Sequence, residues 1–121
     1  MFKLELMLQN LVLKEYALTG GAELTIGRQF DNDVVLDDRA VSRYHATIAV
    51  KNRKLHIFDK GSKNGIIVNK VRVKSAQLCD GDIIKIGKNF IFRVSVPPGK
   101  KKDATVTGVQ DLEAGVLKVS D

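Results

Sequence analysis

Five polar side chains lie where short apolar runs of this sequence give way to loops, and their chemistry suits an anion. Arg28 directly follows one such run, and Ser42 and Arg43 precede a second. Ser62 and Lys63 precede a third. A guanidinium offers a planar fork of donors, an ammonium a point charge and a hydroxyl a neutral donor. If the three loops meet at one end of a sheet framework, the sequence predicts a phosphate-binding site there.

Signatures of catalysis and of metal binding are incomplete in this chain. The stretch Gly81–Asn89 has five residues between its glycines where a P-loop has four, and it ends in Asn rather than Ser or Thr. His45 and His56 have no carboxylate or cysteine at ligand spacing. The single cysteine, Cys79, is predicted to be an inert, half-buried thiol. We therefore expect no catalytic residue, no metal site and no cofactor.

The framework that positions these loops is predicted to be all-β. Apolar and polar residues alternate in many short segments, as in Phe2–Leu6, and Gly, Asn and Asp separate them. Gly27 and Asp80-Gly81 are interpreted as a sharp turn and a hairpin turn. Short strands without intervening helices favour a two-sheet antiparallel β-sandwich. The predicted strands are 2–6, 11–17, 23–26, 34–36, 44–50, 54–58, 66–68, 70–73, 83–86 and 90–96.

Length and charge indicate one basic domain followed by a tail. The chain has 121 residues and a net charge of +6. The sequence predicts a domain over 1–96 and a flexible, Lys-containing tail over 97–121, in which four Lys balance four acidic residues. The basic excess therefore belongs to the domain and suggests an anionic partner, such as a phosphorylated protein, a nucleic acid or a membrane surface. The single cysteine and the lack of a long apolar run indicate a cytoplasmic protein, and we expect no membrane partner.

Four short motifs, in this order and spacing, resemble those of the forkhead-associated (FHA) domain. The motifs are Gly27-Arg28, Ser42-x-x-His45, Asn64-Gly65 with Asn69, and Asp80-Gly81-Asp82. The resemblance runs from about Glu23 to Val94. It implies a sandwich of about eleven strands, of the SMAD/FHA type, with a phosphothreonine-peptide site on loops at one end. It also implies a binding module rather than an enzyme.

The resemblance assigns a role to each matching position. Arg28 would bind the phosphate through its guanidinium, Ser42 would donate its hydroxyl, and Arg43 would be a second basic contact. Asn64 would hold the peptide backbone through its side-chain amide. The departure is Lys63, which stands where the family commonly has Thr, and it is expected to replace that hydroxyl with a cation.

Three further positions are expected to support the site without touching the ligand. His45 would brace the loop that carries the serine. Gly65 would permit the tight turn after Asn64, and Gly27 would permit the turn before Arg28.

The leading hypothesis is an adaptor that binds phosphothreonine-containing protein segments downstream of a Ser/Thr kinase. One alternative is self-recognition, in which the tail residues Thr105 or Thr107 become phosphorylated and occupy the site. Another is nucleic-acid binding through the +6 charge, against which stands the shortage of aromatic residues for base stacking. A third is an inert interaction scaffold. The sequence predicts no target motif and leaves the oligomeric state open.

Overall fold

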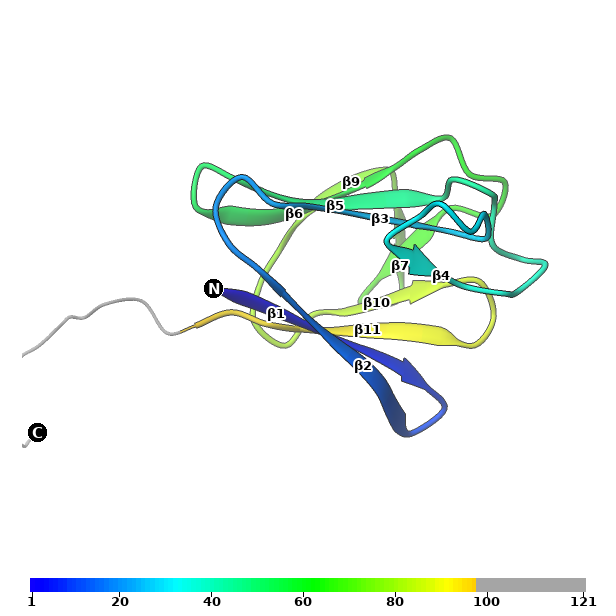
Figure 1. Ribbon diagram of the computed structural model, residues 1–121, viewed down its shortest axis with the longest axis horizontal. Helices are drawn as coiled ribbons and strands as arrows, with labels where there is room; N and C mark the ends of the chain where they lie inside the picture. The colour runs from blue at the N-terminus through cyan, green and yellow to red at the C-terminus, as the bar shows by residue number, and fades with distance from the viewer. Residues whose placement is uncertain (98–121) are drawn as a thin grey trace, which may run out of the picture.

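The computed structural model describes residues 1–97, which fold into two β-sheets packed face to face (Figure 1). This confirms the predicted sandwich of about eleven strands. The six-stranded sheet has the order β2 (Leu11–Leu18), β1 (Phe2–Leu8), β11 (Phe90–Ser95), β10 (Ile83–Ile86), β7 (Ile66–Val68) and β8 (Val71–Val73). The five-stranded sheet has the order β4 (Val34–Val35), β3 (Glu23–Gly27), β5 (Ala46–Lys51), β6 (Lys54–Asp59) and β9 (Ser75–Leu78).

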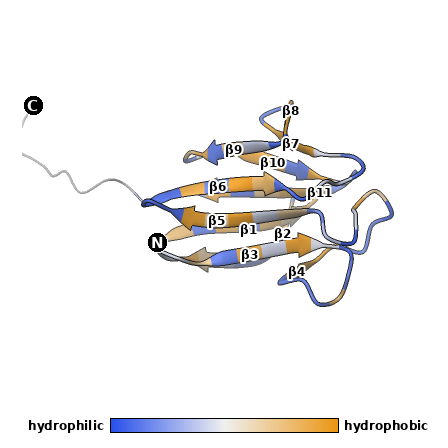
Figure 2. Ribbon diagram, turned by 90° about the horizontal axis from the view of Figure 1, so that it is seen from above, coloured by the Kyte–Doolittle hydropathy of each residue, from blue (hydrophilic) through white to orange (hydrophobic). Residues whose placement is uncertain are grey.

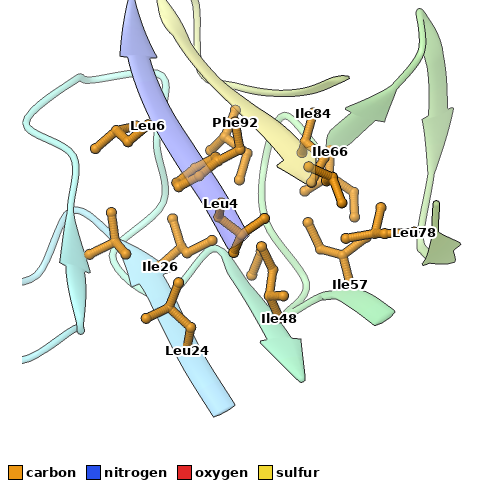
Figure 3. Close-up of a cluster of buried hydrophobic side chains, with 14 of the residues drawn as sticks. Leu4, Leu6, Leu24, Ile26, Ile48, Ile57, Ile66, Leu78, Ile84 and Phe92 are labelled. Atoms are coloured by element: carbon orange, nitrogen blue, oxygen red, sulfur yellow. The ribbon is translucent and has the colours of Figure 1, made fainter. Parts of the chain in front are cut away.

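The core lies between the sheets and follows the alternation in the sequence. Leu4 of β1 and Phe92 of β11 are fully buried on one side, and Ile26, Ile48 and Ile57 face them from the other sheet (Figure 3). Burying an apolar side chain of this size contributes about 1.5–3 kcal/mol. The intervening residues of the same strands are more exposed, so the alternation alone fixes which side of each strand faces the core.

The strand predictions missed one strand and began two others too early. The segment predicted over 44–50 forms β5 only from Ala46. Ser75–Leu78 forms β9, which contains no β-branched residue but buries Leu78 and pairs with β6. The segment from Lys70 begins as a strand only at Val71, because Asn69 and Lys70 have positive φ angles of 49° and 72° and form the turn between β7 and β8. The pairing is antiparallel except between β3 and the two-residue β4, which run parallel.

Two local predictions after β9 were wrong. Asp80-Gly81 is not a hairpin turn, because β9 belongs to one sheet and β10 to the other, so the turn passes the chain between the sheets. Cys79 is exposed rather than half-buried, because it follows β9 directly in this connection. Its N–H donates to the Asp82 carboxylate, 2.8 Å away.

The two ends of the described chain lie at the same end of the sandwich. Phe2 and Val96 line one cavity of about 420 Å³ there. The loops that carry the candidate phosphate ligands lie at the opposite end (Figure 1), and hydrophilic residues dominate these loops (Figure 2). Beyond Pro97, the predicted tail with Thr105 and Thr107 lies outside the described residues. None of the described segments is a helix with the length and apolarity needed to cross a bilayer.

Candidate phosphate-binding site

The end of β3 is joined to the loop between β4 and β5 by two hydrogen bonds from Arg28. The Arg28 backbone N–H donates to the Ser42 carbonyl at 3.0 Å. The Arg28 Nε donates to the Val41 carbonyl, also at 3.0 Å. The second bond fixes the base of the guanidinium and leaves its two terminal nitrogens for a ligand.

The loop between β6 and β7 is joined to the same surface. The Lys63 backbone N–H donates to Ser42 Oγ at 3.0 Å, and Asn64 Nδ2 donates to the Ala40 carbonyl at 2.8 Å. The three loops therefore meet at one end of the sandwich, which fulfils the condition that the sequence analysis set for a phosphate-binding site. Ser42 Oγ acts as an acceptor here, and no hydrogen bond within residues 1–97 uses its own O–H. That proton is therefore available to an anion.

His45 joins two of these loops from beneath and is fully buried. The Ser42 backbone N–H donates to His45 Nδ1 at 3.0 Å, and His45 Nε2 lies 2.7 Å from the Gly65 carbonyl oxygen. Because Nδ1 accepts, the proton of the neutral ring belongs on Nε2, which donates to Gly65. The ring therefore braces the loop that carries Ser42 against the loop that carries Asn64.

Gly27 supports the site by close approach and not by a turn. It is the last residue of β3 and does not have a positive φ angle. A Cβ at this position would overlap the Arg43 carbonyl oxygen and approach Asn32 Nδ2 to 2.7 Å. Glycine is therefore required because the backbone of the β4–β5 loop lies directly against it.

Asn32 is a supporting residue that the sequence analysis missed. It is one of two buried polar residues in the described chain, with 9% of its surface exposed. Its Nδ2 donates to the Gln29 carbonyl at 2.8 Å and to the Arg43 carbonyl at 2.9 Å. The side chain thus fastens the loop after Arg28 to the residue next to Ser42. In the sequence it looks like any other polar residue of a turn.

Ser62 does not join the phosphate donors that the sequence grouped with it. Its Oγ donates to the Asp59 carboxylate and accepts the Gly65 N–H, 2.9 Å away. Both functions of the hydroxyl are therefore used within its own loop. Of the two serines, only Ser42 keeps a donor for a ligand.

The Asp38 carboxylate connects the β4–β5 loop to the turn between β10 and β11. It accepts the Ala40 N–H at 2.8 Å and the Lys88 N–H at 3.2 Å. The hydrogen bond from Ala40 is the main cause that lowers the pKa of Asp38 below its ordinary value of 3.8. Asp38 thus steadies Ala40 and Val41, the residues whose carbonyls hold Asn64 and Arg28.

We expect Asp38→Asn to lower the stability of the protein near neutral pH but not in acid. A lowered folded-state pKa contributes stability that is present above the unfolded-state pKa and is lost as pH falls through the folded-state value. The urea midpoints of the two proteins should therefore differ at about pH 7 and converge as the pH falls through the lowered folded-state pKa of Asp38. A difference that stays constant over this range would show that the carboxylate charge contributes nothing.

The same end of the molecule exposes two aromatic side chains but no metal-ligand cluster. Phe30 is 83% exposed and Tyr44 is 53% exposed. The Tyr44 hydroxyl donates to the Asp31 carboxylate at 2.9 Å, which raises the pKa of that hydroxyl. Throughout residues 1–97, no three His, Cys, Asp or Glu side chains lie close enough to share a metal ion.

Comparison with known proteins decides the family. The FHA domain profile matches residues 24–87, the span that contains all three loops. The chain belongs to the FHA domain family. The FHA domain is a recognition fold, so the domain in this chain is a binding domain.

Relatives of this FHA domain include regulators and solved domains. It is 39% identical over 82 residues to the glycogen accumulation regulator GarA of Mycobacterium tuberculosis, an alignment that covers 68% of this chain and 51% of GarA. The chain thus spans about half the length of this curated relative. The FHA domain of CT664 from Chlamydia trachomatis superposes with a TM-score of 0.73 at 28% identity, covering 80% of this chain and 98% of that one. A domain from a structural and functional analysis of phosphothreonine-dependent FHA domain interactions superposes with a TM-score of 0.68 at 33% identity. The superposition covers 79% of this chain and 98% of that domain.

Proposed function

We propose that this FHA domain is a cytoplasmic adaptor that binds phosphothreonine-containing segments of proteins in Ser/Thr-kinase signalling. The single observation that carries this function is the hydrogen bond from the Lys63 N–H to Ser42 Oγ. It brings Lys63 and Ser42 together on a surface that Arg28 already shares. A phosphate dianion matches such a set of two cations and a hydroxyl.

In this proposal each site residue has a distinct task. Arg28 and Ser42 bind the phosphate oxygens, and Arg43 and Lys63 add positive charge beside them. Asn64 binds the peptide backbone, because the second N–H and the oxygen of its amide have no hydrogen-bond partner within residues 1–97. Residues 1–96 form the recognition unit, and the segment from residue 97 is a tail outside it.

The relatives support the proposal in two ways. GarA is a glycogen accumulation regulator, and the solved domain with a TM-score of 0.68 comes from work on phosphothreonine-dependent FHA domain interactions. Binding that depends on phosphorylation also suits the basic charge of the domain, because the modification adds nearly two negative charges and three acceptor oxygens.

Titration calorimetry with three matched peptide pools tests the proposal. The pools have phosphothreonine, phosphoserine or unmodified threonine at a fixed position among otherwise varied residues. We expect saturable heat with phosphothreonine alone. Equal binding to the unmodified pool would contradict the proposal. Tight binding to single-stranded DNA that weakens steeply with salt, together with indifference to phosphothreonine, would favour the nucleic-acid alternative.

A further inference from the structure

A second cationic surface borders the loop that carries Lys63 and Asn64. Arg72 of β8 and Lys74, just after it, line a cavity of about 440 Å³. Gly65 and Ser62, from the β6–β7 loop, form part of the wall. The loop is thus shared between the candidate phosphate site and this Arg72–Lys74 pocket.

The fold holds both cations on the side of the chain that faces away from the core. Val73, between them, packs against the core, so the alternation of the strand turns Arg72 and Lys74 outward, where both are exposed. The Lys74 carbonyl accepts the Asp59 N–H at 2.8 Å, which fixes the backbone beside the pocket.

Arg72 is also fitted closely to the loop. Gly65 has a φ of 76°, and a Cβ built on it would lie 2.5 Å from Arg72 Nε. The guanidinium therefore lies over loop backbone that only glycine leaves uncovered. The cationic side chain of Arg72 therefore lies directly beside Gly65, the residue that follows Asn64.

The charges of the pocket are not balanced from within. Neither Arg72 nor Lys74 forms an ion pair with a carboxylate of residues 1–97. The one carboxylate that lines the pocket belongs to Asp59, and its Oδ1 already accepts the N–H and the hydroxyl of Ser62. Two cations thus share a cavity large enough for a carboxylate or a phosphate group.

We propose that the Arg72–Lys74 pocket is a second anion-binding subsite, which takes an acidic or phosphorylated side chain of the same partner segment that presents phosphothreonine. This inference rests on the proposed function. Because both subsites share the β6–β7 loop, a partner bound at the first places its neighbouring residues close to the second. The second contact is then intramolecular and adds affinity at little further entropic cost.

The test uses a phosphothreonine peptide with alanine at every other position and a set in which one Asp or one phosphoserine is moved along it. Each peptide is titrated into the wild type and into Arg72→Gln/Lys74→Gln. Lys3→Gln/Lys54→Gln is the matched control, because it removes the same charge from exposed strand positions outside both sites. We expect one position at which Asp tightens wild-type binding about threefold to tenfold, and phosphoserine more. The pocket variant should lose this gain but still bind the alanine peptide.

Each remaining outcome overturns the proposal in a distinguishable way. Equal affinity for all acidic peptides would remove the second subsite and leave the phosphothreonine function intact. If no peptide bound, both the second subsite and the phosphothreonine function would be contradicted. If inorganic phosphate shifts the NMR signals of Arg72 and Lys74 while no peptide position matters, the pocket binds free anions and is not a subsite for the partner.

Discussion

Arg28→Ala is expected to raise the Kd for a phosphothreonine peptide by about thirtyfold to several thousandfold, equivalent to about 2–5 kcal/mol. The reason is that the guanidinium pairs directly with the dianion in our proposal. Truncation leaves that charge without its bidentate partner. The folded protein should change little in stability, because Arg28 is exposed and its side chain makes a single hydrogen bond, to Val41. Calorimetry gives the Kd, and thermal unfolding shows that the variant is folded.

One further variant separates the fork of donors from the positive charge, and another serves as the control. Arg28→Lys keeps the cation but loses the planar fork, and it should bind with intermediate affinity. Lys85→Ala removes an exposed cation from β10 and should bind as the wild type does. If Arg28→Ala retained an affinity near that of the wild type, the phosphate would have to bind elsewhere on the domain.

His45→Ala is expected to lower the free energy of unfolding by about 3–5 kcal/mol, although the residue touches no ligand. The substitution leaves a cavity and removes the partners of the Ser42 N–H and the Gly65 carbonyl. It also disconnects the loop that carries Ser42 from the loop that carries Asn64. Urea unfolding measures the stability, and peptide affinity measured where the variant is folded should fall as well.

A substitution that restores one of the two hydrogen bonds of His45 tests whether each bond contributes to stability. Asn can place an oxygen near the position of Nδ1 and should recover the bond from Ser42 but not the bond to Gly65. His45→Asn is therefore expected to lie between the wild type and His45→Ala. A loss below about 1 kcal/mol in His45→Ala would mean that the two loops hold each other without the ring.

The strand framework could be predicted because burial imposes a period of two on the sequence. Segments such as Phe2–Leu6 show that period plainly, and the same residues are the ones that the core buries. β9 escaped detection because Ser, Ala and Gln have little strand preference, and its place depends on pairing with β6. Such pairing joins residues that are distant in sequence.

The sequence proposes the residues of the candidate site but does not predict the hydrogen bonds that connect its loops. The types and order of Arg28, Ser42 and Asn64 indicate an anion site, and the structure joins their loops. The internal use of the Ser62 hydroxyl and the bridging by Asn32 depend on which backbone groups lie nearby. The polar residue types are the same in either case, so no local pattern distinguishes them.

Pro97 lies at the end of the sandwich opposite Arg28. This position limits how the phosphate-binding site can bind a residue of the domain's own C-terminal tail. Thr105 lies eight residues beyond Pro97 in the sequence, a reach of about 28 Å when fully extended. The six residues of β5 alone span about 20 Å of the distance to be crossed, before the loops are added. Binding of a phosphate on Thr105 by Arg28 of the same molecule would therefore use most of that maximal reach. The same phosphate could meet a neighbouring molecule without strain, which would favour head-to-tail association.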